Sequence, residues 1–185
     1  MMTSAAQRIL TAVQEILMSR GIEEVSIRNV AAAAGVSVGA VQHHYKTKDE
    51  LLMAAMDQVS EAFVADVTAV LDPDAPARSN LEAVCRILGS VDAESRPASV
   101  IWLAYASKAA TSDAVARAHR QSWRLMEQGL TALLQRLDPA FGADDAALLM
   151  AFLDGLAVAR ATESDRMTPE RAQRLLDRFL GQLRP

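Results

Sequence analysis

Gln42, His43 and His44 form a short polar run whose side chains suit contact with a nucleic acid. A glutamine amide can both donate to and accept from adenine in the major groove, and histidine and lysine side chains can bind phosphates. Lys48 follows closely and adds a positive charge. A solvated helix face without a partner is the alternative explanation. A metal site at the two histidines is disfavoured, since adjacent helix residues point about 100° apart.

The residues before this run predict two short helices joined by a tight turn. Ser26 can cap a helix over 27–34, and Gly35 suits the left-handed conformation that stops it. Ser37 can then cap a second helix over 38–45. Two helices joined in this way make a helix-turn-helix unit.

Val41 and Tyr45 of the second predicted helix should face the core, which leaves the other face of this helix free. Small residues at Gly39 and Ala40 let the helix end approach a base pair, and Ala40 can meet a thymine methyl. Arg28 can reach a phosphate or a guanine edge. The residues that we expect to contact DNA are Ser26, Arg28, Ser37, Val38, Gly39, Ala40, Gln42, His43, His44 and Lys48.

The remaining sequence is helical throughout, with no sustained alternation of period two. We therefore predict an all-α protein of about nine helices. Apolar periodicity and proline residues set the ends of these predicted helices. One helix begins near Pro97. The other predicted helices cover residues 4–20, 48–70, 79–91, 112–137, 144–161 and 169–183.

The predicted helix-turn-helix belongs to a longer motif of unlike residues at fixed spacing. This motif resembles the DNA-binding signature of the TetR family of transcriptional regulators. The matching residues read Gly21-x-x-x-x-Ser26-x-Arg28-x-Val30-Ala31-x-x-Ala34-Gly35-Val36-Ser37-x-Gly39-x-Val41-x-x-His44-Tyr45-x-x-Lys48-Asp49-Glu50-Leu51. One departure concerns recognition: Gln42 stands where the family usually has tyrosine, so an operator sequence cannot be transferred from relatives.

The resemblance implies a function and a domain layout. Residues 1–47 would form the helix-turn-helix DNA-binding domain. Residues 48–185 would form an effector-binding and dimerisation domain, with 48–70 as the connecting helix. Such a protein is a homodimer that binds a palindromic operator in double-stranded DNA, most often as a repressor, and is released by a small-molecule effector.

Aromatic and polar side chains in the middle of the chain mark the expected effector site. The helix over 112–137 carries a stripe that includes His119 and Trp123, and Trp102 and Tyr105 share a face of the preceding helix. Such stripes also occur in plain cores, and the sequence leaves both explanations open. The expected ligand-binding residues are Met56, Phe63, Trp102, Tyr105, His119, Trp123 and Met126.

The last two predicted helices carry apolar faces wider than one neighbour requires. An intrachain core would explain them, but the resemblance implies a four-helix dimer interface built from two such pairs. The expected interface residues are Leu148, Leu149, Phe152, Leu156, Leu175, Leu176, Phe179 and Leu183.

Composition limits the other function classes. The 185-residue chain has a net charge of −4 and one cysteine, Cys85, which excludes an intrachain disulfide and suits the cytoplasm. We expect no membrane segment, because no apolar run approaches the ~20 residues needed. Glycine-rich phosphate loops, nucleophile elbows and metal-ligand clusters are missing, so we expect no catalysis, cofactor or metal. The rival hypotheses are a regulator without a small ligand and a helical scaffold protein of this fold.

Overall fold

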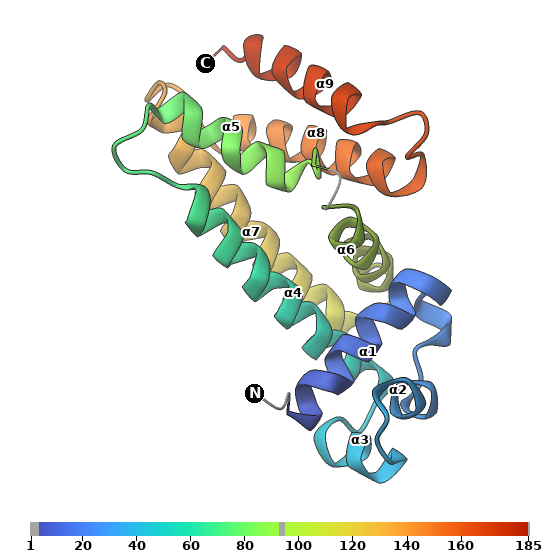
Figure 1. Ribbon diagram of the computed structural model, residues 1–185. Helices are drawn as coiled ribbons and strands as arrows, with labels where there is room; N and C mark the ends of the chain where they lie inside the picture. Colours follow the sequence, from blue (N-terminus) through green and yellow to red (C-terminus); the bar gives the residue numbers. More distant parts are fainter. Residues whose placement is uncertain (1–3, 93–94, 185) are drawn as a thin grey trace. The chain divides into compact units, whose positions relative to one another are not determined.

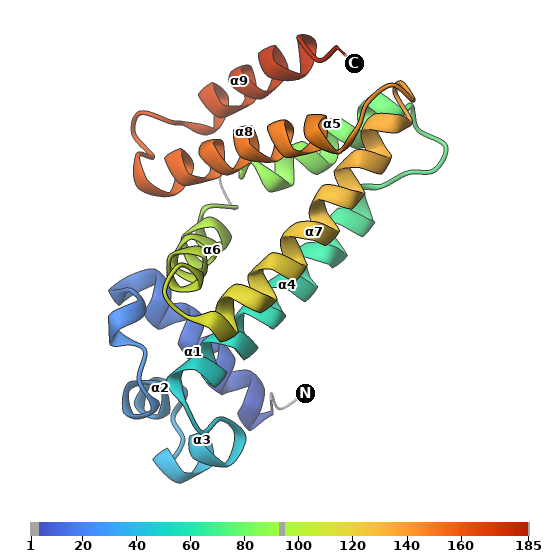
Figure 2. The ribbon, with the colours of Figure 1, turned by 180° about the vertical axis from the view of Figure 1, so that it is seen from behind.

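The computed structural model describes residues 4–92 and 95–184, and over this part of the chain all regular structure is helical, as predicted. Nine α-helices lie in these residues. Their course along the chain can be followed in Figures 1 and 2. The chain forms two compact units. Unit 1 is Met1–Ala62 with Val100–Ala116, and unit 2 is Phe63–Ser99 with Arg117–Pro185. The unit boundaries therefore fall inside helices α4, α6 and α7, whereas the predicted domain boundary at residue 47 stays a prediction.

Unit 1 contains the predicted helix-turn-helix and the helices that hold it. A 3₁₀ turn at Ile22–Glu24 (η1) follows α1 and was not predicted. The α-helices that contribute to unit 1 are α1 (Ala5–Arg20), α2 (Ile27–Ala34), α3 (Val38–His44), the first part of α4 (Lys48–Val70), most of α6 (Arg96–Ala109) and the start of α7 (Asp113–Gln135).

Serine side chains begin three of these helices. Ser4 accepts a hydrogen bond from the Gln7 N–H at 3.1 Å, and Ser26 and Ser37 cap α2 and α3 in the same way. Gly35 ends α2 at φ 63° and ψ 39°, the left-handed conformation in which a side chain is strained. The predicted caps and the predicted turn are thus confirmed.

The core of unit 1 is apolar and closely packed around α1. Val41 is the residue of α3 that is fully buried, and it anchors this helix from one side only. Ile101 of α6 belongs to the same core. The other buried members are Ile9, Ala12, Val13, Ile16, Leu17, Val25, Val30, Ala31, Leu51, Leu52 and Ala55.

Unit 2 contains three complete helices and parts of three others. Its complete helices α5, α8 and α9 pack against one another, and Val67 near the end of α4 packs against the same core. Thr168 caps α9 and Pro169 is its first residue, as predicted. The three helices that lie wholly within unit 2 are α5 (Ala77–Leu88), α8 (Ala143–Thr162) and α9 (Pro169–Gly181).

Helix α5 ends earlier than its periodicity predicts. The sequence indicated a helix to residue 91, but α5 stops at Leu88. A Cβ at Gly89 would lie 3.1 Å from both the Cys85 carbonyl oxygen and Leu156 Cδ2, which is tighter than an ordinary van der Waals contact, so α5 approaches α8 closely here. Ser90 then takes a positive φ of 49°. Apolar periodicity does not report such a close approach.

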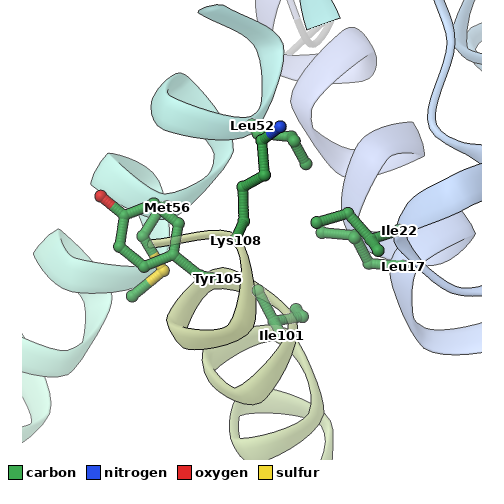
Figure 3. A pocket seen from close by; sticks show the side chains of 7 residues that line it. All are labelled: Leu17, Ile22, Leu52, Met56, Ile101, Tyr105 and Lys108. Carbon is green, nitrogen blue, oxygen red and sulfur yellow. The ribbon is translucent and has the colours of Figure 1, made fainter. Parts of the chain in front are cut away.

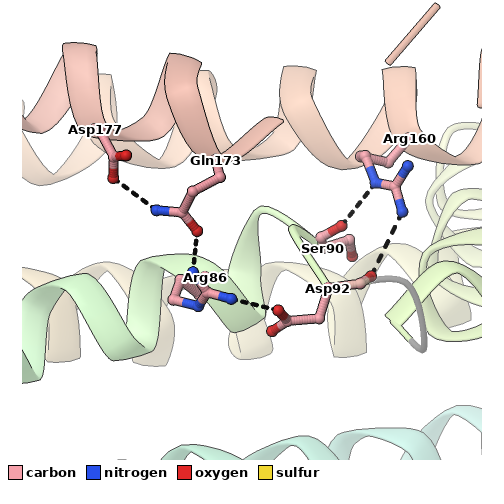
Figure 4. A network of polar contacts seen from close by, with 6 residues as sticks. All are labelled: Arg86, Ser90, Asp92, Arg160, Gln173 and Asp177. Carbon is pink, nitrogen blue, oxygen red and sulfur yellow. Dashed lines mark hydrogen bonds and ion pairs between the residues drawn. The ribbon is translucent and has the colours of Figure 1, made fainter. Parts of the chain in front are cut away.

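A buried arginine ties the loops of unit 2 together (Figure 4). Arg160 is only 3% exposed, and its guanidinium donates to the carbonyl oxygens of Ser90 at 3.0 Å and Met167 at 2.6 Å. Arg86 of α5 also bonds the side chains of Asp92 and Gln173. Buried carbonyl oxygens need hydrogen-bond donors, and Arg160 supplies them to those of Ser90 and Met167. In this way Arg160 joins the end of α5 to the turn between α8 and α9.

Candidate nucleic-acid interface

One face of α3 is packed and the other is open. Val41 is fully buried, whereas Gln42, His43 and His44 are exposed and Val38 is 44% exposed. Gly39 is also exposed and nothing but the Ser37 hydroxyl lies near the position of a Cβ there, at 3.9 Å. An apolar valine next to a glycine and an amide, all open to solvent, is a surface with the size and chemistry of a base-reading helix face.

The two capping serines lie at the starts of α2 and α3. The Ser26 hydroxyl oxygen accepts from the Asn29 N–H at 3.2 Å, and the Ser37 oxygen accepts from the Ala40 N–H at 3.1 Å. In a cap the hydroxyl acts as acceptor, so its own O–H can still donate. Ser37 is exposed and Ser26 is half-buried, and both helix starts favour an anion. Each serine can therefore cap its helix and bind a phosphate at the same time.

The rings of the two adjacent histidines contact each other edge to face. Their ring centroids are 5.3 Å apart and their planes are at 75°. The neighbouring Tyr45 is half-buried, packs against the core of unit 1, and has its pKa raised by burial. Tyr45 thus supports the end of α3 from inside, while His43 and His44 stay on the surface. Over the described residues no group of three or more His, Cys, Asp or Glu side chains is placed to hold a metal.

The start of α4 carries a cap that the sequence analysis missed. The Thr47 hydroxyl accepts from the Glu50 N–H at 3.1 Å, and the Glu50 carboxylate accepts from the Lys46 N–H at 2.7 Å. The spacing of threonine and glutamate in "TKDE" is the signal that could have found it.

Lys48 donates to the Glu23 carbonyl oxygen at 3.5 Å, a long bond that leaves its ammonium able to turn to a phosphate. Arg28 is exposed.

The expected effector residues are divided between the two units. Within unit 2, His119 and Trp123 stack with ring centroids 4.5 Å apart, and burial lowers the pKa of His119, as does Arg120. Trp123 and Met126 pack against the core of unit 2, so both contribute to the core whether or not they also meet a ligand. Unit 1 contains Met56, Trp102 and Tyr105, and unit 2 contains Phe63, His119, Trp123 and Met126.

A small cavity lies inside unit 1 between α1, η1, α4 and α6 (Figure 3). Its volume is about 10 Å³, which is room for about one water molecule and too little for an effector. Met56 and Tyr105 are the expected ligand residues on its wall, and Lys108 is its one charged member. The full lining is Leu17, Ile22, Leu52, Met56, Ile101, Tyr105 and Lys108.

The expected dimer residues separate into a buried and an open group. Leu149, Leu156 and Leu176 are buried in unit 2's own core and support the surface without forming it. Leu148 is 68% exposed. The half-buried members are Phe152, Leu175, Phe179 and Leu183. The part of these helices that can meet a partner is therefore narrower than the whole predicted set.

Burial shifts the pKa of two further titratable groups in unit 2. Cys85 is buried and desolvation raises its pKa to about 12, which makes it an unreactive thiol at neutral pH. Burial also raises the pKa of the half-buried Asp154 to about 6.

Among the described helices, none is long and apolar enough to cross a membrane.

The open face of α3, its capped start and the capped start of α4 define a helix-turn-helix DNA-binding protein with a helical C-terminal part. Comparisons with known proteins agree over nearly the whole chain. Residues 9–55 match the family profile of bacterial regulatory proteins of the tetR family, and residues 76–185 match the C-terminal profile of BetI-type transcriptional repressors.

Relatives and solved structures show the same likeness. The HTH-type transcriptional regulator BetI 2 of Chromohalobacter salexigens is 30% identical, over 96% of this chain and 87% of its own length. A transcriptional regulator from Rhodococcus sp. Rha1 has a TM-score of 0.88 at 33% identity, covering 96% and 95% of the two chains. A putative transcriptional regulator from Saccharomonospora viridis, solved in complex with choline, has a TM-score of 0.87 at 18% identity, covering 96% of each chain.

The chain belongs to the TetR family. It is a DNA-binding transcriptional regulator whose C-terminal part is of the BetI type.

Proposed function

We propose that this regulator binds a palindromic operator as a homodimer, represses from it, and is released by a small-molecule effector. The observation that carries the proposal is the open face of α3, where Gln42 and the two histidines are exposed on a helix anchored by Val41. Contacts from Ser26, Arg28, Ser37, Lys48 and the α3 face would position this helix in the major groove.

A dimer follows from the way such helices read DNA. One recognition helix covers few base pairs, and two of them about 34–36 Å apart match successive turns of a palindrome. The exposed part of α8 and α9, from Leu148 to the half-buried phenylalanines and leucines, is the surface that we propose for the partner copy. Apolar side chains of this size are stabilised when a second copy covers them.

We propose the middle helices as the effector region. The expected residues are aromatic or polar, which suits a mostly apolar pocket with a few orienting groups. The regulator from Saccharomonospora viridis, which shares this fold, was solved with choline, and this makes choline a reasonable first probe. An aromatic face attracts a quaternary ammonium through its quadrupole, and the expected residues include the aromatic Trp102, Tyr105 and Trp123.

A regulator without a small ligand is the second candidate. It is favoured by the packing of Trp123 and Met126 against the core of unit 2 and by the size of the cavity in unit 1. In this case the abundance of the regulator itself, or a protein partner, would control occupancy of the operator.

Under either proposal the protein has no catalytic role, and it acts in the cytoplasm, where its operator lies.

The test begins with selection of the purified protein against a random duplex library. Enrichment of a palindrome with half-sites about one helical turn apart supports the dimeric operator-binding proposal. Failure to enrich any sequence would contradict it and favour a scaffold protein of this fold. Choline is then titrated onto the protein bound to the selected duplex, with sodium chloride at equal ionic strength as control. Release by choline alone supports effector control by an organic cation.

A further inference from the structure

Unit 1 contains a segment that the sequence places far from the helix-turn-helix. Residues 100–116, from α6 and the start of α7, pack with the N-terminal helices. Ile101 is 5% exposed in the same core as Leu17 and Leu52. The C-terminal end of α6 therefore lies against the helices that hold the DNA-facing surface.

Lys108 links this end of α6 to the first turn of α4. Its aliphatic chain lines the small cavity beside Leu52 (Figure 3), and its ammonium nitrogen lies 3.4 Å from Asp49 Oδ1. The two side chains are 29% and 44% exposed. The pair is thus partly shielded from water, where a charge interaction is stronger than at a fully exposed site.

Asp49 is poorly placed for a protein that binds phosphates. It follows Lys48 directly and precedes Glu50, so two carboxylates come immediately after the lysine that we expect to contact DNA. The Glu50 carboxylate is occupied by the Lys46 N–H. Asp49 gains its opposite charge from Lys108, 59 residues further along the chain. A carboxylate without this partner would repel the phosphate backbone.

We propose that Lys108 is a positioning residue for operator binding. It acts through Asp49: the ion pair cancels a negative charge beside Lys48 and fixes the first turn of α4 against α6. The proposal uses the DNA-binding activity of the family together with the expected phosphate contact at Lys48. Lys108 lies outside the helix-turn-helix signature, so its role follows from the folded chain alone.

The test compares four proteins of full length on one operator duplex at two salt concentrations. Lys108→Met keeps the aliphatic chain that fills the cavity wall and removes the charge. We expect it to weaken operator binding about three- to tenfold at low salt, with a smaller loss at high salt because salt screens the uncovered carboxylate. Asp49→Asn in the same chain should restore the affinity, since it removes the charge that Lys108 had covered. Lys108→Arg should keep near-normal affinity.

A charge control and a stability measurement separate this role from simpler ones. Arg124→Met removes the same charge from an exposed position of α7 in unit 2 and should change the affinity less than twofold. Urea unfolding of each variant shows whether lost binding reflects lost folding. An unchanged affinity for Lys108→Met, a loss independent of salt, or a failure of Asp49→Asn to restore binding would each overturn the proposal. If the wild-type protein selects no operator, the proposed function fails instead.

Discussion

Phe152 of α8 and Phe179 of α9 stack with ring centroids 4.0 Å apart and ring planes 7° apart. Leu148 lies one turn before Phe152, and Leu175 lies one turn before Phe179. Leu183 follows just after α9 ends at Gly181. Residues four apart share a helix face, so the stacked rings bring two apolar stripes side by side. This pair of stripes is the surface that we propose for the second copy.

Leu148→Glu should separate the proposed dimer without unfolding the chain. Leu148 is 68% exposed, so its loss changes the stability of the monomer by no more than about 0.5 kcal/mol, whereas a charge in an apolar interface is strongly unfavourable. The mass measured by light scattering should fall to that of one chain. Leu125→Glu is the matched control, because Leu125 is 62% exposed on α7. Equal behaviour of the two variants would contradict the proposed interface.

Gln42→Ala and Lys48→Ala should weaken operator binding in different ways. Loss of a base contact should change the preference at one operator position by about 1–3 kcal/mol. Loss of a phosphate contact should weaken binding to every duplex and lower the salt slope by about one unit. Both effects are measured by titrating single-base operator variants at several salt concentrations. If Gln42→Ala weakens all duplexes equally, Gln42 does not read a base.

Two glycines of the helix-turn-helix should respond oppositely to alanine. Gly35 has a φ of 63°, so Gly35→Ala should destabilise the protein by about 1–2 kcal/mol. Gly39 lies within α3 with open space around it, so Gly39→Ala should stabilise the fold by about 0.5–1 kcal/mol. We expect the same Gly39→Ala variant to bind the operator more weakly, because its methyl group holds the helix away from the bases. Urea unfolding and operator titration measure the two effects separately; unchanged operator binding by Gly39→Ala would argue against close approach there.

The pKa of Asp154 predicts a pH-dependent loss of stability. Burial raises this pKa from 3.8 to about 6, so between these values the folded state binds the proton more tightly than the unfolded chain. The contribution of Asp154 to the stability of the folded state therefore falls as the pH rises through this window, and it is constant above it. A shift of two units corresponds to about 3 kcal/mol, and partial exposure of the side chain reduces this to roughly 1–1.5 kcal/mol.

Asp154→Asn should remove that pH dependence. The variant and the wild type should be about equally stable at pH 4, and the variant should be more stable at pH 7.5. The exposed Asp165, replaced by asparagine, is the control and should change little at either pH. Urea unfolding at the two pH values measures the difference. Equal stability of Asp154→Asn and wild type at pH 7.5 would show that the carboxyl is solvated in the folded protein.

Local signals in the sequence were sufficient for the helix-turn-helix. Ser26, Gly35 and Ser37 begin or end helices through bonds to residues three or four positions away, so spacing alone predicts them. Helix α4 was predicted over its full observed length because its apolar repeat is long. The role of Gln42 as a base reader rests on the same local pattern and stays a prediction.

Tertiary structure alone decided which distant residues meet. Helix α5 stops at Leu88, next to the close approach of Gly89 to Leu156, and Leu149, Leu156 and Leu176 turn inward although the sequence does not distinguish them from Leu148. The pairing of Asp49 with Lys108 has no local signal. Helix signals arise from neighbours along the chain, whereas these contacts depend on how separate helices pack, and the apolar pattern of one helix does not specify its partner.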